Sequence, residues 1–274
     1  MGDGLALEAE VIVRELDGRW VVIEQVEHAR HTGAIAEAWN RGPFGPLPAS
    51  FITAARMHDI GWAEWDLQPT LDPVTGGPAN FPTVRDDRHS DFYARGIRSV
   101  AGEDAYAGYL VSLHASGLYS GRYGWSGLEP IAWDSLGDAG RCFLIDQKRY
   151  RTELLEGRLR EHPELVEFEA TWSCFMLLQT VDYLSLLCCL GLGATGCGPV
   201  PLGPSWGRVA VRRTGPWAVA LNPFPFPGDS LELEVASRSL PMRLGPSEAE
   251  MRSALAAAPV EMRATRYERL SEGL

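Results

Sequence analysis

The sequence contains very little lysine: Lys148 is the only one among 274 residues, and the formal net charge is −11 at pH 7. A chain with this charge balance repels polyanions unless a local basic patch overrides it, which argues against nucleic acids and anionic membranes as partners. The expected partner is a small-molecule substrate, with a homodimer as an open alternative.

Cysteine is also scarce, and its spacing excludes the common structural roles. The five cysteines are odd in number and show no paired spacing of the metal-binding type. Cys174, Cys188 and Cys189 lie in apolar sequence typical of a helix, where a reduced thiol behaves as a small hydrophobic group. The N-terminus carries acidic residues and no continuous apolar run, unlike an export signal. Together these features predict a cytoplasmic protein.

Several motifs of familiar enzyme classes are missing. The chain has no P-loop and no dinucleotide-type glycine motif after a strand, which argues against a nucleotide-phosphate cradle. A serine nucleophile is not expected either, because the available histidines are better used as metal ligands. The most apolar run, from Cys174 to Leu192, is interrupted by Gln179, Asp182 and Tyr183. That interruption favours a buried core helix over a membrane span and already suggests a polar site inside the helix.

Hydrophobic periodicity predicts a mainly α protein with β-structure at both ends. Residues 9–15 and 19–24 alternate around Asp17-Gly18, as in a β-hairpin. Helical patterns follow at about 25–39, 49–62, 88–101, 104–118, 138–161 and 164–190. The stretch 67–84 is a proline- and glycine-rich loop, and from residue 200 short β-type runs dominate, with one helix near 247–257. We therefore expect a hairpin at 1–24, a helical metal-binding domain at 25–199 and a small β-rich extension at 200–274 that packs on the hairpin.

Polar residues within the apolar helical sequence indicate a metal site. His58 and Asp59 are adjacent at the end of a predicted helix, where the side chains of consecutive residues can converge on one ion. His28 lies on the preceding helix, His114 lies in YLVSLHASGLY and Asp182 lies in MLLQTVDYLSLL. Burying such groups without a partner is costly, and a shared divalent cation would supply the partner.

This order of residues on successive helices resembles the HD-domain superfamily of metal-dependent phosphohydrolases. The segments QVEHARHTGAIAEAW, MHDIGWAEWDLQP and SLHASGLY also resemble an uncharacterised bacterial family of HD-like proteins, over about residues 20–240. The resemblance implies an HD-like helical bundle in which His28, His58, Asp59 and Asp182 hold the metal.

A second pair of histidines, His89 and His114, lies between the doublet and the last aspartate. Its position resembles the extra histidines of binuclear HD proteins, including the mixed-valent di-iron oxygenases. The resemblance then implies that Asp59 bridges two ions and that His89 and His114 bind the second. The expected cofactor is one or two divalent ions, iron, manganese or another metal, with iron favoured in a binuclear site.

Aromatic residues around the doublet are candidates for the wall of a substrate pocket, although aromatic side chains more often belong to a core. These residues are Trp62, Trp65 and Phe81. Glu64 and Asp66 lie between them and are candidate acid or base groups beside Asp59.

Two arginines are candidates for binding a substrate anion. Arg56 precedes the doublet and Arg122 follows His114, and surface ion pairs are the alternative role for both. His31 lies one helical turn after His28 and shares a helix face with it, but His28 is the preferred ligand on the resemblance.

Three functions are compatible with this pattern. The first is a metal-dependent hydrolase that acts on a small-molecule phosphoester or related bond through metal-activated water, as the superfamily resemblance implies. The second is a mixed-valent di-iron oxygenase acting on a small organic substrate. The third is a non-catalytic binding module in which the metal only stabilises the fold.

Overall fold

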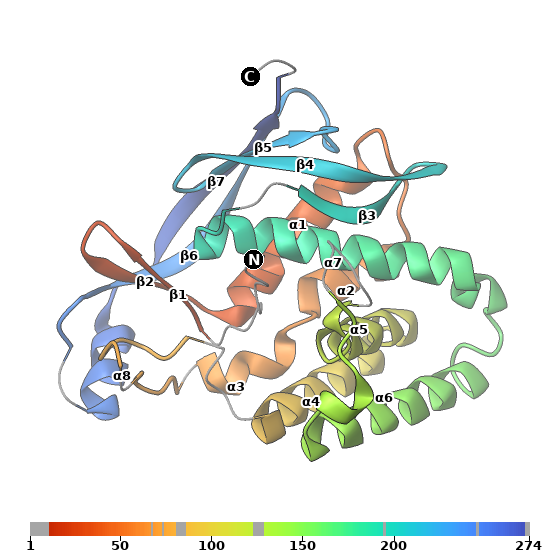
Figure 1. The fold of residues 1–274 in the computed structure, drawn as a ribbon, viewed down its shortest axis with the longest axis horizontal. Coiled ribbons are helices and arrows are strands. Elements are labelled where there is room, and N and C mark those ends of the chain that lie inside the picture. Colours follow the sequence, from red (N-terminus) through yellow and green to blue (C-terminus); the bar gives the residue numbers. More distant parts are fainter. Residues whose placement is uncertain are drawn as a thin grey trace.

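The strands of this protein form one large sheet rather than a small extension. The computed structural model describes residues 11–66, 68–72, 74–80, 86–122, 129–193, 196–244 and 247–271. It contains 51% helix and 23% strand, and the seven strands form a curled, mixed half-barrel over the helices (Figure 1). The predicted mainly α, HD-like helical bundle is therefore wrong. Each strand has an ordinary local pattern, but the single large sheet forms only because segments that are far apart in the sequence pair with one another.

The sheet joins the two ends of the chain. Its order is β1-β2-β6-β7-β5-β4-β3, with β5 and β7 parallel and the other neighbours antiparallel. The strands are β1 (Ile12–Leu16), β2 (Arg19–Ile23), β3 (Gly196–Leu202), β4 (Ser205–Gly215), β5 (Ala218–Asn222), β6 (Ser230–Pro241) and β7 (Glu261–Arg269).

The predicted N-terminal hairpin is present. Asp17 and Gly18 both have positive φ values, 51° and 69°, as a tight hairpin turn requires. β2 then pairs with β6, which ties the hairpin to the C-terminal strands. Strand β3 was not predicted, because Gly196, Gly198 and Pro199 follow helical sequence and are residues typical of the end of a helix. The domain boundaries stay a prediction.

The helices agree closely with the periodic pattern. They are α1 (Gln25–Asn40), α2 (Ala49–Met57), η1 (Ile60–Trp62), α3 (Ala63–Asp66), α4 (Asp86–Glu103), α5 (Ala105–Leu118), η4 (Trp133–Ser135), α6 (Asp138–Glu156), η5 (Pro163–Val166), α7 (Phe168–Leu190) and α8 (Glu248–Ala257). The side chain of Asp104 caps α5 by accepting hydrogen bonds from the backbone N–H groups of Tyr106 and Ala107. Ser247 and Glu250 form a capping box at α8.

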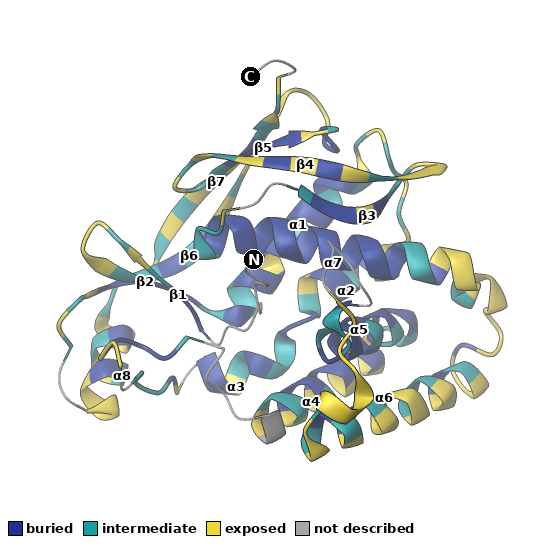
Figure 2. Cartoon of the chain, viewed as in Figure 1, coloured by how far each residue is buried: buried dark blue, intermediate teal, exposed yellow. Residues whose placement is uncertain are grey.

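Helix α7 lies at the centre of the molecule, between the sheet and the other helices (Figure 2). It is long and apolar enough to cross a membrane, but 89% of its most apolar window is buried inside the protein, as in a core helix. A single large cluster of buried side chains includes residues of the helices and of the sheet, such as Phe175 and Tyr267. The helices that carry the polar residues therefore pack against one another and share one hydrophobic core with the sheet.

Candidate metal centre

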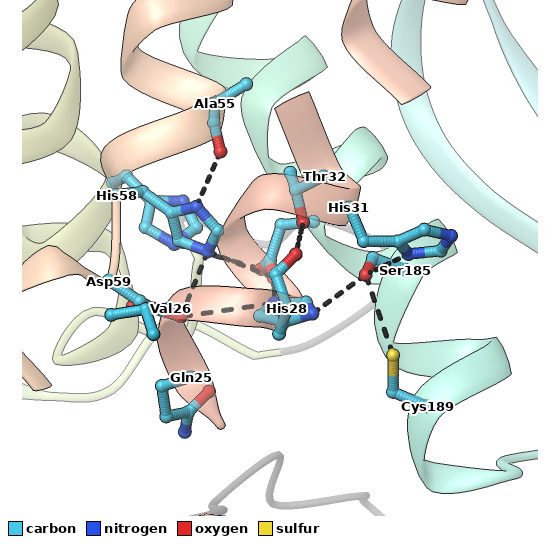
Figure 3. Close-up of polar contacts among 12 residues, drawn as sticks. Gln25, Val26, His28, His31, Thr32, Ala55, His58, Asp59, Ser185 and Cys189 are labelled. Atoms are coloured by element: carbon cyan, nitrogen blue, oxygen red, sulfur yellow. Dashed lines mark hydrogen bonds and ion pairs between the residues drawn. The ribbon is translucent and has the colours of Figure 1, made fainter. Parts of the chain in front are cut away.

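Five polar side chains from four helical segments meet in the interior of the protein. They are His28 on α1, His58 and Asp59 after α2, His114 on α5 and Asp182 on α7, and each is at most 5% exposed. They line a small cavity of about 10 Å³, a volume on the scale of one water molecule or one ion. Figure 3 shows how His28, His58 and Asp59 lie together.

The end of α2 explains how two consecutive residues reach the same point. His58 keeps helical dihedral angles (φ −57°, ψ −30°), whereas Asp59 leaves the helix (φ −107°, ψ 16°). Neighbouring side chains inside a helix diverge by about 100°, and the change of direction after Met57 turns the carboxylate back toward the imidazole. His58 Nε2 consequently lies 3.1 Å from Asp59 Oδ2.

His28, His58 and Asp182 form the tightest group. One possible ligand atom from each residue lies within 4.8 Å of the other two. His28 Nε2 is 3.0 Å and His58 Nε2 is 3.6 Å from Asp182 Oδ1, and Asp59 Oδ2 is 3.9 Å from His28 Nε2. Mixed imidazole and carboxylate donors are a common ligand set for transition metals. This buried group could therefore hold a metal ion.

The second oxygen of Asp182 faces other partners. Arg122 Nη1 lies 3.2 Å from Asp182 Oδ2 and donates a 2.7 Å hydrogen bond to Gln179 Oε1. Arg122 and Gly121 both have left-handed backbone angles (φ 52° and 58°), which is unfavourable for an arginine and marks a constrained turn. His114 Nε2 is 3.8 Å from the same oxygen. Asp182 thus presents Oδ1 to the histidine pair and Oδ2 to Arg122.

The orientation of His58 fits a metal ligand. Its Nδ1 donates a 2.9 Å hydrogen bond to the carbonyl oxygen of Ala55, one turn earlier in α2. Its Nε2 is fully buried and makes no hydrogen bond, and it lies 3.1 Å from Asp59 Oδ2. A buried nitrogen in this state loses its interaction with water without replacement unless a cation binds to it. Donation of the other ring N–H to a backbone carbonyl is typical of metal-binding histidines.

The net negative charge of the centre favours the binding of a cation. Asp59 and Asp182 carry two negative charges and Arg122 carries one positive charge, which leaves −1 when the histidines are neutral. Burial opposes ionisation of both carboxylates, but the neighbouring histidines, and Arg122 for Asp182, outweigh it and lower both pKa values. Burial also opposes a charged His58, yet Asp59 and Asp182 raise the pKa of His58 to about 10. Without a metal, a proton on His58 takes the place of the cation.

A chain of hydrogen bonds determines which nitrogen of His28 faces the centre. His28 Nδ1 contacts Ser185 Oγ, Ser185 Oγ contacts His31 Nδ1, and His31 Nε2 contacts Thr265 Oγ1, each at 2.8 Å (Figure 3 shows the first two). The Thr265 hydroxyl donates to the carbonyl oxygen of Leu233, so it must accept from His31 Nε2–H.

The donor and the acceptor of each hydrogen bond in this chain can be assigned in turn, starting from Thr265. Burial lowers the pKa of His31 to about 3, so its ring is neutral and Nδ1 must accept a hydrogen bond from Ser185. Ser185 then accepts from His28 Nδ1–H, which leaves the His28 Nε2 lone pair directed at Asp182 Oδ1. Two facing lone pairs repel each other, and a cation between them turns the repulsion into attraction.

Asp59 is held from the opposite side by α4. Tyr93 donates a 3.0 Å hydrogen bond to Asp59 Oδ1, which leaves Oδ2 on the side of the histidines. Gly61 and Gly96 let η1 and α4 approach closely, because a Cβ atom at Gly61 would lie 2.0 Å from the carbonyl oxygen of Phe92. Two glycines therefore set the distance between the His58-Asp59 turn and α4.

The sixth candidate ligand, His89, lies outside the tight group. Its Nδ1 is 2.6 Å from the hydroxyl of Tyr119, and its ring packs against Trp62 and Tyr93 with centroid distances of 5.3 and 4.8 Å. The His89 ring thus packs against Tyr93, and Tyr93 in turn contacts Asp59. A second ion bound by His89 stays a prediction.

The other candidate residues occupy different surroundings. Glu64 is exposed and pairs with Arg95 at 2.6 Å, and Trp65 lines an outer groove on the same side of the protein. Asp66 is buried and accepts hydrogen bonds from the first two backbone N–H groups of α1, at 3.0 and 3.1 Å. Burial raises its pKa to about 7. Asp66 therefore anchors the helix that carries His28.

The remaining candidates for substrate binding lie partly in the core, partly at the surface and partly at the metal centre. Trp62 is fully buried in an aromatic cluster with Phe92 and Tyr93. Arg56 is exposed and pairs with Glu37. Arg122 lines the cavity of the metal centre. Phe81 lies outside the described residues.

Sequence reasoning missed several residues that support the centre. It did not identify Tyr93, Ser185 and Thr265, and it treated His31 only as a competitor of His28. Ser185 lies three residues after Asp182, a spacing that puts both on one face of α7 and could have indicated it. No local signal points to Thr265, because β7 reaches the site only through the sheet.

Comparison with known proteins assigns the chain to a family. A family model described as a protein of unknown function, DUF3891, matches residues 11–242. No curated protein and no solved structure matches the chain. The matched range includes all five polar side chains of the centre, whereas Thr265 lies beyond it. The chain therefore belongs to the DUF3891 family of proteins of unknown function.

Proposed function

We propose that this protein is a metal-dependent hydrolase that cleaves a phosphoester or related bond in a small molecule. The observation that carries the proposal is the buried group of His28, His58 and Asp182, in which His58 Nε2 has no hydrogen bond. The order of these residues along the chain also resembles that of HD-domain phosphohydrolases, and this resemblance supports the choice of bond.

We assign the metal to His28, His58 and Asp182, with Asp59 Oδ2 as the neighbouring fourth donor. A bound divalent cation would polarise the scissile bond and lower the pKa of water toward neutrality. Asp59 is ionised and held by Tyr93 through Oδ1, which leaves Oδ2 available to the metal. Arg122 lines the same cavity and would bind the anionic oxygen of the substrate.

The remaining members of the centre keep it dry and rigid. His114 is neutral, because burial lowers its pKa to about 3, and its ring packs edge-on against His58 with a centroid distance of 5.1 Å. Leu118 and Leu186 also line the cavity and exclude water from its wall. Glu64 and Asp66, which are not among the described residues that line this cavity, have no part in the proposed reaction.

Metal analysis tests the site. We expect one divalent ion per chain in the wild-type protein and none in His58→Ala, as measured by inductively coupled plasma mass spectrometry. The matched control is His162→Ala, because His162 is exposed and its side chain lies 3.4 Å from Glu164 at the surface. Equal metal content in both variants would remove the assigned site.

Hydrolysis is tested separately with p-nitrophenyl phosphate and bis-p-nitrophenyl phosphate. We expect turnover of at least one substrate by wild type and the His162→Ala control, loss with a chelator, and recovery when metal is restored. Two irons per chain together with substrate-dependent O₂ uptake would replace the hydrolase with the di-iron oxygenase. A full metal site without turnover of either ester, or of other phosphoesters, would favour the non-catalytic module.

A further inference from the structure

A second site lies on the surface between α3, α4 and α8. It is a groove of about 530 Å³, a size that accommodates a small organic ligand (Figure 1 shows the three helices). Four arginines line it: Arg88, Arg95 and Arg98 on α4, and Arg252 on α8. The three arginines on α4 are spaced by seven and three residues, so they lie along one face of the helix.

Aromatic rings support the guanidinium groups in the groove. Arg88 lies over Trp65 at 5.7 Å, Arg95 over Phe92 at 5.4 Å and Arg98 over Tyr150 at 5.2 Å from the ring centroids. A guanidinium group that lies over an aromatic ring keeps its positive charge, and its N–H groups can bind the oxygens of an anion in pairs.

The fourth guanidinium is held by hydrogen bonds. Arg252 donates from Nε to the carbonyl oxygen of Pro69 at 2.9 Å and from Nη2 to Glu248 at 2.7 Å. This anchors it between α8 and the segment that follows α3. Arg252 is therefore positioned before any ligand arrives, which lowers the entropic cost of binding.

The charge of the groove is opposite to that of the whole protein. Four arginines, the two acidic side chains in its lining (Glu64 and Asp91) and Glu248, which pairs with Arg252, give a net charge of +1, whereas the whole chain carries −11. Glu64 is already paired with Arg95, and Arg98 forms no ion pair within the described residues. The groove is therefore a positively charged surface on an acidic protein, which favours an anionic ligand.

The groove is separate from the metal centre. None of the residues that line the groove also lines the cavity of the five polar side chains. The aromatic side chains of Trp62, Trp65 and Phe92 form a packed layer with ring centroids 5.0 and 5.7 Å apart, and Trp62 is fully buried in it. A molecule in the groove would therefore bind independently of the metal.

We propose that this groove is a binding site for an organic phosphate, a phosphomonoester dianion attached to a small organic group. The phosphate would accept hydrogen bonds from the guanidinium groups of α4 and Arg252, and the organic part would lie along the groove beside Trp65, which is part of its lining. This site does not depend on the proposed hydrolase, and it is distinguished from the metal centre by its residues.

The test uses benzylphosphonate, a phosphomonoester analogue that cannot be hydrolysed, and isothermal titration calorimetry of the full chain. We expect saturable binding with one site per chain, weakened roughly tenfold or more in Arg98→Gln, since a hydrogen bond to a charged group contributes about 1.5–3 kcal/mol. Arg88→Gln should weaken binding similarly. The matched control is Arg212→Gln, an exposed arginine on β4 that changes the net charge equally and should leave binding unchanged.

Two further titrations decide between this site and others. Binding should persist in excess chelator, and phenylacetate, which has a similar ring but one negative charge, should bind more weakly. Loss of binding with the chelator would assign the phosphonate to the metal centre and overturn the proposal. Equal binding by Arg98→Gln and Arg212→Gln, or equal affinity for phenylacetate, would overturn it as well.

Discussion

Replacing Gly61 by alanine should push α4 away from the turn that carries His58 and Asp59. The new methyl group would lie 2.0 Å from the carbonyl oxygen of Phe92 and 3.1 Å from the backbone nitrogen of Gly96. Real Cβ atoms essentially never show contacts below 3.0 Å, so α4 must move by about 1 Å. The obstacle is helix backbone, which cannot rotate away as a side chain can. We expect the unfolding free energy to fall by about 3 kcal/mol, the upper range for overpacking in a core.

The control for this substitution lies on α4 itself. No atom lies within 4 Å of the position that a Cβ atom would take at Gly102, so Gly102→Ala should change stability by only about 0.5 kcal/mol, in the stabilising direction. Urea unfolding followed by circular dichroism, in excess chelator, measures both variants. Gly61→Ala should also weaken metal binding, because the shift of α4 removes the hydrogen bond from Tyr93 to Asp59. If the two variants are equally stable, the close approach of η1 and α4 is refuted.

Three further predictions concern the support of the centre. Ser185→Ala should lower metal affinity about 10- to 100-fold without unfolding the protein, because His28 loses the partner that orients its ring; competition with a chromophoric chelator measures this, and unchanged affinity would contradict the hydrogen-bond chain. Folding raises the pKa of Asp66 from 3.8 to about 7, so the folded state holds this proton more tightly and the unfolding free energy falls as pH rises through that window, by at most about 4 kcal/mol. Asp66→Asn should remove this part of the pH dependence, and parallel stability curves for the two proteins would show that burial does not dominate. Metal at 100 times its dissociation constant should stabilise the wild-type protein by about 2.7 kcal/mol, seen as a rise in Tm, but should leave Tm of His58→Ala unchanged.

Local sequence patterns were sufficient to predict most of the individual elements, with β3 as an exception. The helices from α1 to α8 follow hydrophobic periodicity and capping residues, which act within one or two turns. The Asp17-Gly18 turn is similarly local, because its two positive φ values depend on the residues themselves. Buried polar residues such as Asp182 could be identified because burying a carboxylate in an apolar helix is costly unless it is paired or binds a metal.

The overall architecture was not predictable in this way. The sheet depends on pairs such as Arg19 with Pro241, which are remote in sequence. Alternation of polar and apolar residues tells which face of a strand is buried, but it does not identify the neighbouring strand. For this reason the C-terminal strands were predicted only as a small β-rich extension that packs on the hairpin, whereas all seven strands form one half-barrel over α7.

By itself, the sequence determined the chemical identity of the donors and the helices on which they lie, because residue type and helical period are local properties. Tertiary structure alone decided which donors meet. The close packing of α4 on η1 puts Tyr93 beside Asp59, whereas His89 contacts Tyr119. The pairing of β7 in the sheet brings Thr265 to the chain of hydrogen bonds that orients His28. Contacts of this kind depend on how distant segments pack, and no short stretch of sequence contains that information.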